Sequence, residues 1–172
     1  MALARLIDGE VSTEPSRVEL NTHRDRILIK LEGPQSLNIR MMLRGHEGAH
    51  VCDGSRFLEP VQVSGSACGC PPTWGQRRAA SRGGQGPKPE ITVRFRLVEA
   101  LGIGCFDLVS SSWALIEDIE AARASLSASD WPAKACLSID RSVFTTAEGV
   151  EVIIRRPKMR LLNPISRFLI SV

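Results

Sequence analysis

The chain has 172 residues, of which 43% are hydrophobic and 24% are charged, and its formal net charge is +3. This length suits one domain with a substantial core, and the composition is that of a soluble globular protein. No apolar run approaches the roughly 20 residues of a membrane span, and the N-terminal residues lack the pattern of a secretory signal. We therefore expect a cytoplasmic protein without a membrane segment, folded as a single domain over residues 1–172.

The N-terminal quarter is predicted to form a short helix and three strands. The run ALARLIDG predicts a helix that ends where Gly9 adopts a left-handed conformation. Residues 16–33 alternate apolar and polar side chains on both sides of the turn THRD, which indicates a β-hairpin. The run SLNIRMMLRG predicts a further strand, with Met41 and Met42 as core residues.

The segment 50–89 departs from this regular pattern. It is rich in glycine and proline and lacks both the helical and the strand periodicity, which indicates an irregular insert. Within it, Thr73 is expected to cap a short helix over Trp74–Ala80. This helix would place Arg77 and Arg78 on an exposed turn.

The remaining half of the chain is predicted to form four strands and one helix. The run EITVRFRLV alternates strictly, with apolar side chains on one face and Arg94 and Arg96 on the other. The run GCFDLVSSS predicts another strand, after which Ser111 or Ser112 is expected to cap a helix. The runs KACLSIDRSVF and GVEVIIRRPKMRLL predict two strands joined by a turn, and Pro157 indicates an edge strand or a bulge. In total we expect an α+β domain with a mainly antiparallel sheet of about seven strands and two or three helices.

Basic residues concentrate in two segments. Residues 77–96 and 155–167 each carry a net charge of +5, which leaves −7 for the rest of the chain. Such segregation indicates an acidic partner surface or nucleic acid, although basic side chains on exposed strands are often only solvated. The candidate partner-binding or nucleic-acid-binding residues are Arg77, Arg78, Arg82, Lys88, Arg94 and Arg96.

The five cysteines are an odd number and are irregularly placed. This usage suits a reducing compartment, with free thiols or a metal, better than a disulfide framework. Cys105 and Cys136 each lie in an apolar, strand-like run, and both are expected to be small buried residues.

The other three thiols form a candidate zinc site in the insert. Cys52, Cys68 and Cys70 supply three ligands, and a structural zinc ion takes four. The candidates for the fourth ligand are His50 and His46, which directly precede Cys52. Three free thiols without a metal are the alternative interpretation.

Motifs of catalysis are missing from the sequence. It contains no G-x-S-x-G turn, no phosphate-binding loop, no H-E-x-x-H helix and no pair of carboxylates arranged as acid and base. We therefore expect that the protein is not an enzyme.

Three runs of the sequence carry a resemblance to a known family: ALARLIDGEVS, RMMLRGHEGAHVCDGSRF, and the long run from CGCPPTWGQRR to SSWALIEDIEAA. They resemble the bacteriophage recombination directionality factor-like proteins, the accessory factors of large serine integrases. In that family a C-D-G turn precedes C-x-C-P, an R-K or R-R helix, a further cysteine before K-P or Q-P, and a strand V-x-F-R-L. The resemblance covers residues 2–162 and is most specific in the middle third.

Two departures from the family pattern matter. Pro87 stands where family members usually have the fourth cysteine, so the resemblance favours a structural zinc site in which His50 replaces a lost ligand. Family members also usually begin with an additional stretch, so this chain is expected to be a truncated or compact variant.

The resemblance implies a regulator without chemistry of its own. Such a protein would bind a serine integrase and bias it toward excision, by a difference in affinity for two states of the integrase. The alternatives left open are a nucleic-acid-binding module and a subunit of a larger protein or ribonucleoprotein assembly.

Overall fold

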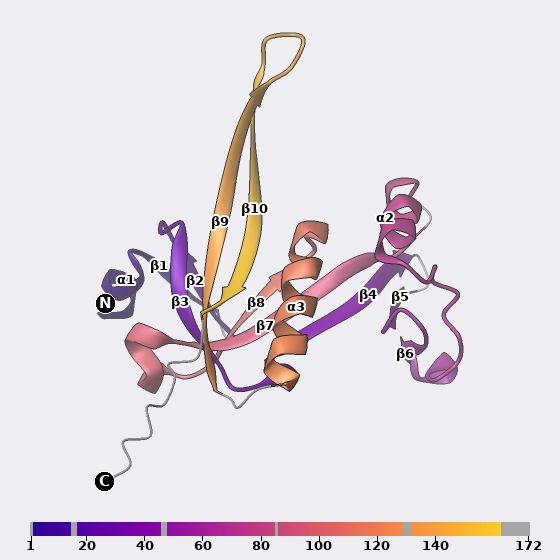
Figure 1. Ribbon diagram of the computed structural model, residues 1–172, viewed down its shortest axis with the longest axis horizontal. Coiled ribbons are helices and arrows are strands. Elements are labelled where there is room, and N and C mark those ends of the chain that lie inside the picture. The colour runs from indigo at the N-terminus through magenta and orange to yellow at the C-terminus, as the bar shows by residue number, and fades with distance from the viewer. Residues whose placement is uncertain (1, 15–16, 46–47, 85, 129–131, 163–172) are drawn as a thin grey trace.

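The computed structural model of the protein describes residues 2–14, 17–45, 48–84, 86–128 and 132–162 (Figure 1). In these residues it contains three α-helices and ten strands, and all strand pairings are antiparallel. The expected α+β class with a single domain is confirmed. None of the described helices combines the length and the apolar character that crossing a membrane requires.

The N-terminal residues form α1 (Ala2–Ile7) and a separate two-stranded sheet of β1 (Gly9–Glu14) and β2 (Arg17–Thr22). The left-handed residue after the helix is Asp8, with φ 48°, and not Gly9 as predicted. Gly9 is required for another reason, because a Cβ there would lie 1.9 Å from the carbonyl oxygen of Asn21 on the paired strand.

The predicted hairpin over residues 16–33 is wrong in its pairing. Both strands exist, but β2 pairs with β1, and β3 (Arg26–Leu31) is an inner strand of the large sheet. Since β7 and β9 occupy the two edges of β3, no edge remains for β2. Alternation indicates which face of a strand is buried, but not which strand lies beside it.

The large sheet has eight strands in the order β10-β9-β3-β7-β4-β5-β6, with β8 paired to β7. The bounds of its other strands are β4 (Leu37–Gly45), β5 (Gly48–Cys52), β6 (Phe57–Glu59), β7 (Lys88–Leu97), β8 (Phe106–Ser110), β9 (Ala133–Thr145) and β10 (Glu151–Leu161). Besides β1, the strands that the sequence did not predict are β5 and β6, which are short and lie at the insert.

The core lies between the sheet and α3 (Ile116–Ser127), which crosses one of its faces (Figure 1). Alternate residues of β7 from Pro89 to Leu97 are buried, as the sequence predicted. A 3-10 turn, η4 (Trp113–Leu115), precedes α3, and the Ser112 side chain before it makes no capping hydrogen bond, contrary to expectation. The Asp118 carboxylate on α3 instead accepts a hydrogen bond of 3.0 Å from the Met159 amide and so ties the helix to β10.

The hairpin of β9 and β10 extends far beyond the body of the molecule (Figure 1). Residues Ala133–Ser138 of β9 pair with β3, whereas beyond Ile139 the strand pairs with β10 alone. We call residues 139–157 the arm. Its turn contains Gly149 at φ 80°, and β10 is an edge strand, which confirms the interpretation of Pro157.

Candidate metal centre

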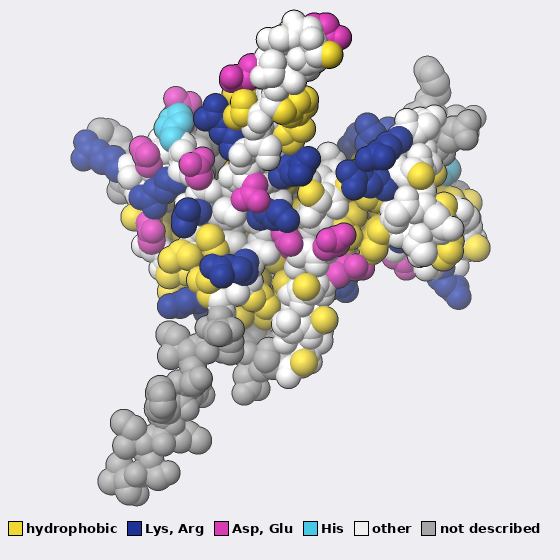
Figure 2. Space-filling model, turned by 45° about the horizontal axis from the view of Figure 1, so that its top comes forward, with side chains coloured by type: hydrophobic (Ala, Val, Ile, Leu, Met, Phe, Trp, Pro, Cys, Tyr) yellow, Lys and Arg dark blue, Asp and Glu magenta, His cyan; other side chains and the backbone are white. Residues whose placement is uncertain are grey.

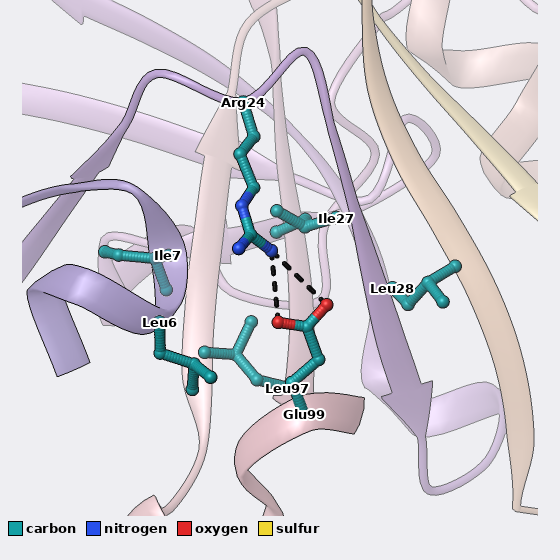
Figure 3. A pocket seen from close by; sticks show the side chains of 7 residues that line it. All are labelled: Leu6, Ile7, Arg24, Ile27, Leu28, Leu97 and Glu99. Atoms are coloured by element: carbon teal, nitrogen blue, oxygen red, sulfur yellow. Dashed lines mark hydrogen bonds and ion pairs between the residues drawn. The ribbon is translucent and has the colours of Figure 1, made fainter. Parts of the chain in front are cut away.

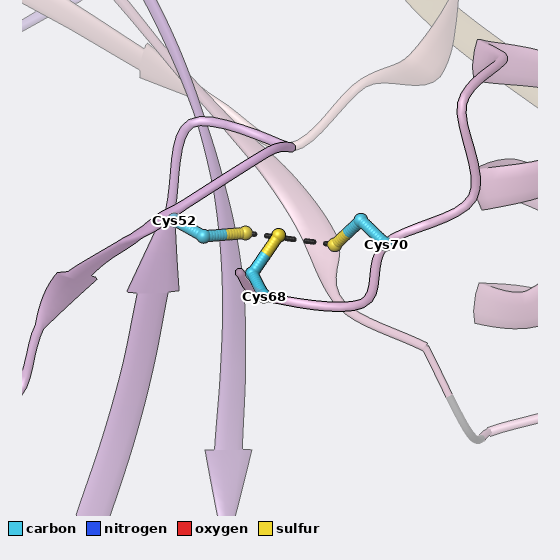
Figure 4. Close-up of side chains that lie close together, drawn as sticks. All are labelled: Cys52, Cys68 and Cys70. Carbon is cyan, nitrogen blue, oxygen red and sulfur yellow. Dashed lines mark hydrogen bonds between the residues drawn. The ribbon is translucent and has the colours of Figure 1, made fainter. Parts of the chain in front are cut away.

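The structure brings the three predicted thiols of the insert together. Cys52 ends β5, and Cys68 and Cys70 lie in the loop that precedes α2 (Trp74–Arg82). Their Sγ atoms all lie within 4.8 Å of one another and point toward a common centre (Figure 4). The distance from Cys52 Sγ to Cys70 Sγ is 3.5 Å. Thiolates around zinc, with bonds of about 2.3 Å in a tetrahedron, are about 3.8 Å apart, so the three sulfurs fit this ion.

A tight turn after Cys52 produces this approach. The Asp53 carboxylate accepts hydrogen bonds of 2.7 Å from the backbone amides of both Ser55 and Arg56. These bonds lower the pKa of Asp53. The chain is thereby turned back, and the Cys68 amide donates to the Ser55 carbonyl at 3.0 Å. Gly69, at φ 72°, then bends the chain between the two remaining thiols.

The three thiols differ in how readily they ionise. Burial raises the pKa of Cys52 to about 12, and burial also raises the pKa of Cys70. Burial opposes ionisation of Cys68 as well, but hydrogen bonds from the Cys70 backbone and from the other two thiols outweigh it and lower the pKa of Cys68. Cys68 is therefore the first of the three to become a thiolate, and a metal ion would displace the protons of the other two.

The predicted fourth ligand does not join this group. His50 lies two residues before Cys52 on β5, and its ring packs edge-on against Phe57, with 5.6 Å between the ring centroids. Among the described residues, the group that could hold a metal consists of the three thiols. His46 lies outside the described residues. Three protein ligands leave one position of a tetrahedral ion for a further donor, such as water.

Arg77 is a structural residue of this insert and does not lie on an exposed turn as predicted. Only 8% of it is exposed. Its guanidinium donates from Nε to the Pro71 carbonyl at 2.6 Å and from Nη2 to the Gly54 carbonyl at 2.9 Å. It also lies 4.6 Å from the ring centroid of Trp74. Arg77 thus joins the turn after Cys52 to the loop after Cys70.

The helix that carries Arg77 begins as the sequence predicted. The Thr73 hydroxyl accepts from the Gln76 amide at 3.3 Å, and the Gln76 side chain accepts from the Thr73 amide at 3.4 Å, which completes a capping box. The helix runs to Arg82, two residues beyond the predicted end. The Trp74 indole donates to the Glu120 carboxylate at 2.7 Å, which attaches the insert to α3.

Two of the predicted basic residues are neutralised within the protein. Arg94 donates two hydrogen bonds, of 2.8 and 2.7 Å, to the Asp107 carboxylate, and these bonds lower the pKa of Asp107. Arg96 donates to the Leu101 carbonyl and lies 3.5 Å from the Glu32 carboxylate. This face of β7 is therefore not the bare basic surface that the alternation of its residues indicated.

The other predicted basic residues are exposed, and none of them makes an ion pair within the described part of the chain: Arg78, Arg82 and Lys88.

The two remaining cysteines differ from expectation, since Cys105 is exposed and Cys136 is half-buried. Cys105 directly precedes β8, whose one partner strand among the described residues is β7.

A small pocket beside α1 is too narrow for a ligand. Its volume is about 10 Å³, and the ion pair between Arg24 and Glu99, at 3.0 Å, closes one side of it (Figure 3). The other side chains that line it are Leu6, Ile7, Ile27, Leu28 and Leu97.

No protein-family model matches the chain, and no solved structure matches it significantly. The resemblance to directionality factors therefore stays a prediction, and inferences about function rest on the residues and their geometry.

Proposed function

We propose that the protein is a non-catalytic, cytoplasmic regulator of phage site-specific recombination, which binds a serine integrase and biases it toward excision. We further propose that the arm is its docking element. The observation that carries this proposal is the arm itself, whose two faces present apolar side chains that no other part of the described chain covers.

The exposed apolar side chains of the arm are unusual for a solvated hairpin. They are between 41% and 58% exposed and comprise Ile139, Val143, Phe144, Val150 and Ile153. A two-stranded hairpin alone is marginally stable in water, and contiguous exposed apolar surface marks a site of protein interaction. A partner protein that covers the arm would stabilise the hairpin and would remove its apolar side chains from water.

The charges on the arm indicate the chemistry of that partner. Three cross-strand pairs continue the face on which Leu137 and Met159 are buried: Ile139 with Pro157, Arg141 with Arg155, and Val143 with Ile153. Two arginines directly opposite each other repel, and neither has an ion pair in the described residues. Successive pairs on one face are about 7 Å apart. The matching partner surface has a carboxylate between two apolar side chains.

Zinc has a structural role in this proposal. Cys52, Cys68 and Cys70 would hold the ion, which would stabilise an insert that has little apolar core of its own. Because the regulator acts only by binding, it shifts the equilibrium between the integrating and the excising arrangement of the integrase. The size of this shift is set by the difference between its binding free energies for the two arrangements.

The test uses the purified full chain and its cognate serine integrase. We expect the two to co-purify and the ratio of excision to integration to rise when the protein is added. The double variant Val143→Thr/Ile153→Thr, which removes apolar surface without adding charge, should weaken both effects and keep the thermal stability of the wild type. Val61→Thr, at an exposed apolar residue of the insert, is the matched control and should keep both. Co-purification unaffected by the arm variant would refute the arm as the docking element, and no association at all would refute the function.

A further inference from the structure

We propose that a second surface, a basic groove beside α2, binds the sugar–phosphate backbone of duplex DNA. The groove has a volume of about 790 Å³ and lies between the C-terminal end of α2 and strands β4, β7 and β8. Its polar lining comprises the cations Arg44, Arg82 and Lys88 and the hydroxyls of Ser81, Ser110 and Ser111. Figure 2 shows Lys and Arg side chains gathered over the end of the molecule that carries α2.

The three cations of the groove are not neutralised by the protein. Neither Arg44 nor Arg82 nor Lys88 has an ion pair within the described residues. The one acidic residue of the lining is Glu90, and its carboxylate is bound by Arg40, which also lies 3.8 Å from the Glu59 carboxylate. Three cations against one carboxylate give the lining a net charge of +2, and a concave basic surface of this kind concentrates anions.

The arrangement suits a DNA backbone better than an acidic peptide. The cations come from three elements, β4, α2 and β7, and three hydroxyl groups share the lining with them. Arginine, lysine and serine side chains are the usual donors to phosphate oxygens, and regularly repeated phosphates satisfy several spread cations at once. Specific peptide recognition instead needs pockets for individual side chains, whereas this groove is broad and open.

The charge pattern of the sequence predicted Arg82 and Lys88 as candidates for such binding, but not Arg44. Arg44 joins them because β4 pairs with β7, with Met42 and Lys88 directly opposite each other, and the sequence alone contains no signal for that pairing. This inference does not depend on the proposed function, because the arm and the groove are different surfaces.

The test measures binding of the zinc-supplemented full chain to a fluorescently labelled 25-base-pair duplex by anisotropy, over a series of KCl concentrations. Three phosphate contacts predict that the logarithm of the association constant falls with the logarithm of salt concentration at a slope of about −2.7. Each of Arg44→Gln, Arg82→Gln and Lys88→Gln should weaken binding for every duplex sequence and reduce the slope by about 1. Arg123→Gln on α3 removes an exposed charge that makes no ion pair in the described residues, and should leave the slope unchanged.

Three results would overturn the proposal. The first is no salt-dependent binding at low salt. The second is an equal loss of affinity in Arg123→Gln and Arg82→Gln, which would indicate that DNA binding depends on the net charge of the protein and not on the groove. The third is competition by poly-L-glutamate as effective as by unlabelled duplex, which would indicate an acidic protein segment. The arm variant Val143→Thr/Ile153→Thr leaves the net charge unchanged and should bind DNA like the wild type, so failure here is distinguishable from failure of integrase binding.

Discussion

The insert and the arm both extend from the sheet, but they are held in opposite ways. The insert has an irregular backbone, yet its polar groups are paired: Arg77 binds two carbonyl groups, Asp53 binds two amides, and Thr73 caps α2. The arm has a regular ladder of strands, yet its side chains on both faces lack cover. Regular backbone pairing and side-chain burial are therefore separate sources of order. The insert is held by polar contacts around three thiols that could bind a metal ion, whereas the apolar side chains of the arm are exposed.

The largest expected effect concerns the insert and the binding of zinc by its three thiols. Cys68→Ser should reduce zinc from one ion per chain to none after gel filtration, with affinity lowered more than about 100-fold, because two thiols remain. Elemental analysis measures this, and Cys105→Ser, an exposed thiol outside the group, should keep one ion. Equal zinc content in Cys68→Ser and Cys105→Ser would contradict the site.

The affinity for zinc should also depend on pH. Burial raises the pKa of Cys52 and Cys70, so zinc must displace their protons, and the affinity of the site for zinc should fall as pH is lowered.

The second effect compares the covered and uncovered parts of one strand. Leu137 and Val143 lie on the same face of β9, but Leu137 is buried in the core and Val143 is exposed on the arm. Leu137→Ala should lower the free energy of unfolding by about 2–5 kcal/mol, because it leaves a cavity. Val143→Ala should change it by less than about 0.5 kcal/mol. Urea denaturation of the isolated chain measures the free energy of unfolding of both variants. A large decrease in Val143→Ala would mean that the arm is covered within the protein.

The third effect tests the clamp on the insert. Arg77→Ala leaves the carbonyl groups of Pro71 and Gly54 without their charged donor, which should lower the free energy of opening the insert by about 2 kcal/mol. Amide hydrogen exchange between Cys52 and Pro89 should then be about 30-fold faster. Arg78→Ala, the exposed neighbour on the same helix, should leave exchange unchanged. Equal exchange in both variants would show that the order of the insert does not depend on this guanidinium.

The smallest effect concerns the ion pair of Arg94 and Asp107, which lies on neither the insert nor the arm. Hydrogen bonds from Arg94 lower the pKa of Asp107, so the pair stabilises the fold above the pKa of an unfolded aspartate. This stabilisation is lost as pH falls through the lowered pKa of the folded state. Arg94→Ala should therefore lower Tm slightly at neutral pH and leave it unchanged in acid, as calorimetry can measure. A Tm difference that persists in acid would assign the loss to packing.

Much of the fold followed from local patterns. The strict alternation of EITVRFRLV predicted β7 and its buried face, the Thr73 cap predicted the start of α2, and Pro157 predicted an edge strand. The pairing of β2 with β1 was not predictable in this way, because alternation contains no information about which strand becomes the neighbour.

The candidate site divides in the same manner. Cysteine spacing predicted the thiol group, since a three-residue run with two thiols and a bend can serve one ion. The burial of Arg77 was not predictable, because its partners are backbone carbonyls up to 23 residues away along the chain, and any residue type supplies such a carbonyl. The glycine at position 54 is the one residue that reflects this burial, because a Cβ there would lie 2.4 Å from Arg77 Nη1.

The sequence by itself determined the class of fold, the strands with a buried face and the three thiols, because periodicity and residue chemistry act over short stretches of chain. Only the tertiary structure decided which basic residues are buried, paired or exposed, since a charge is neutralised by whichever group the fold places beside it. For the same reason, the uncovered arm and the basic groove became visible only when strands distant in sequence were placed side by side.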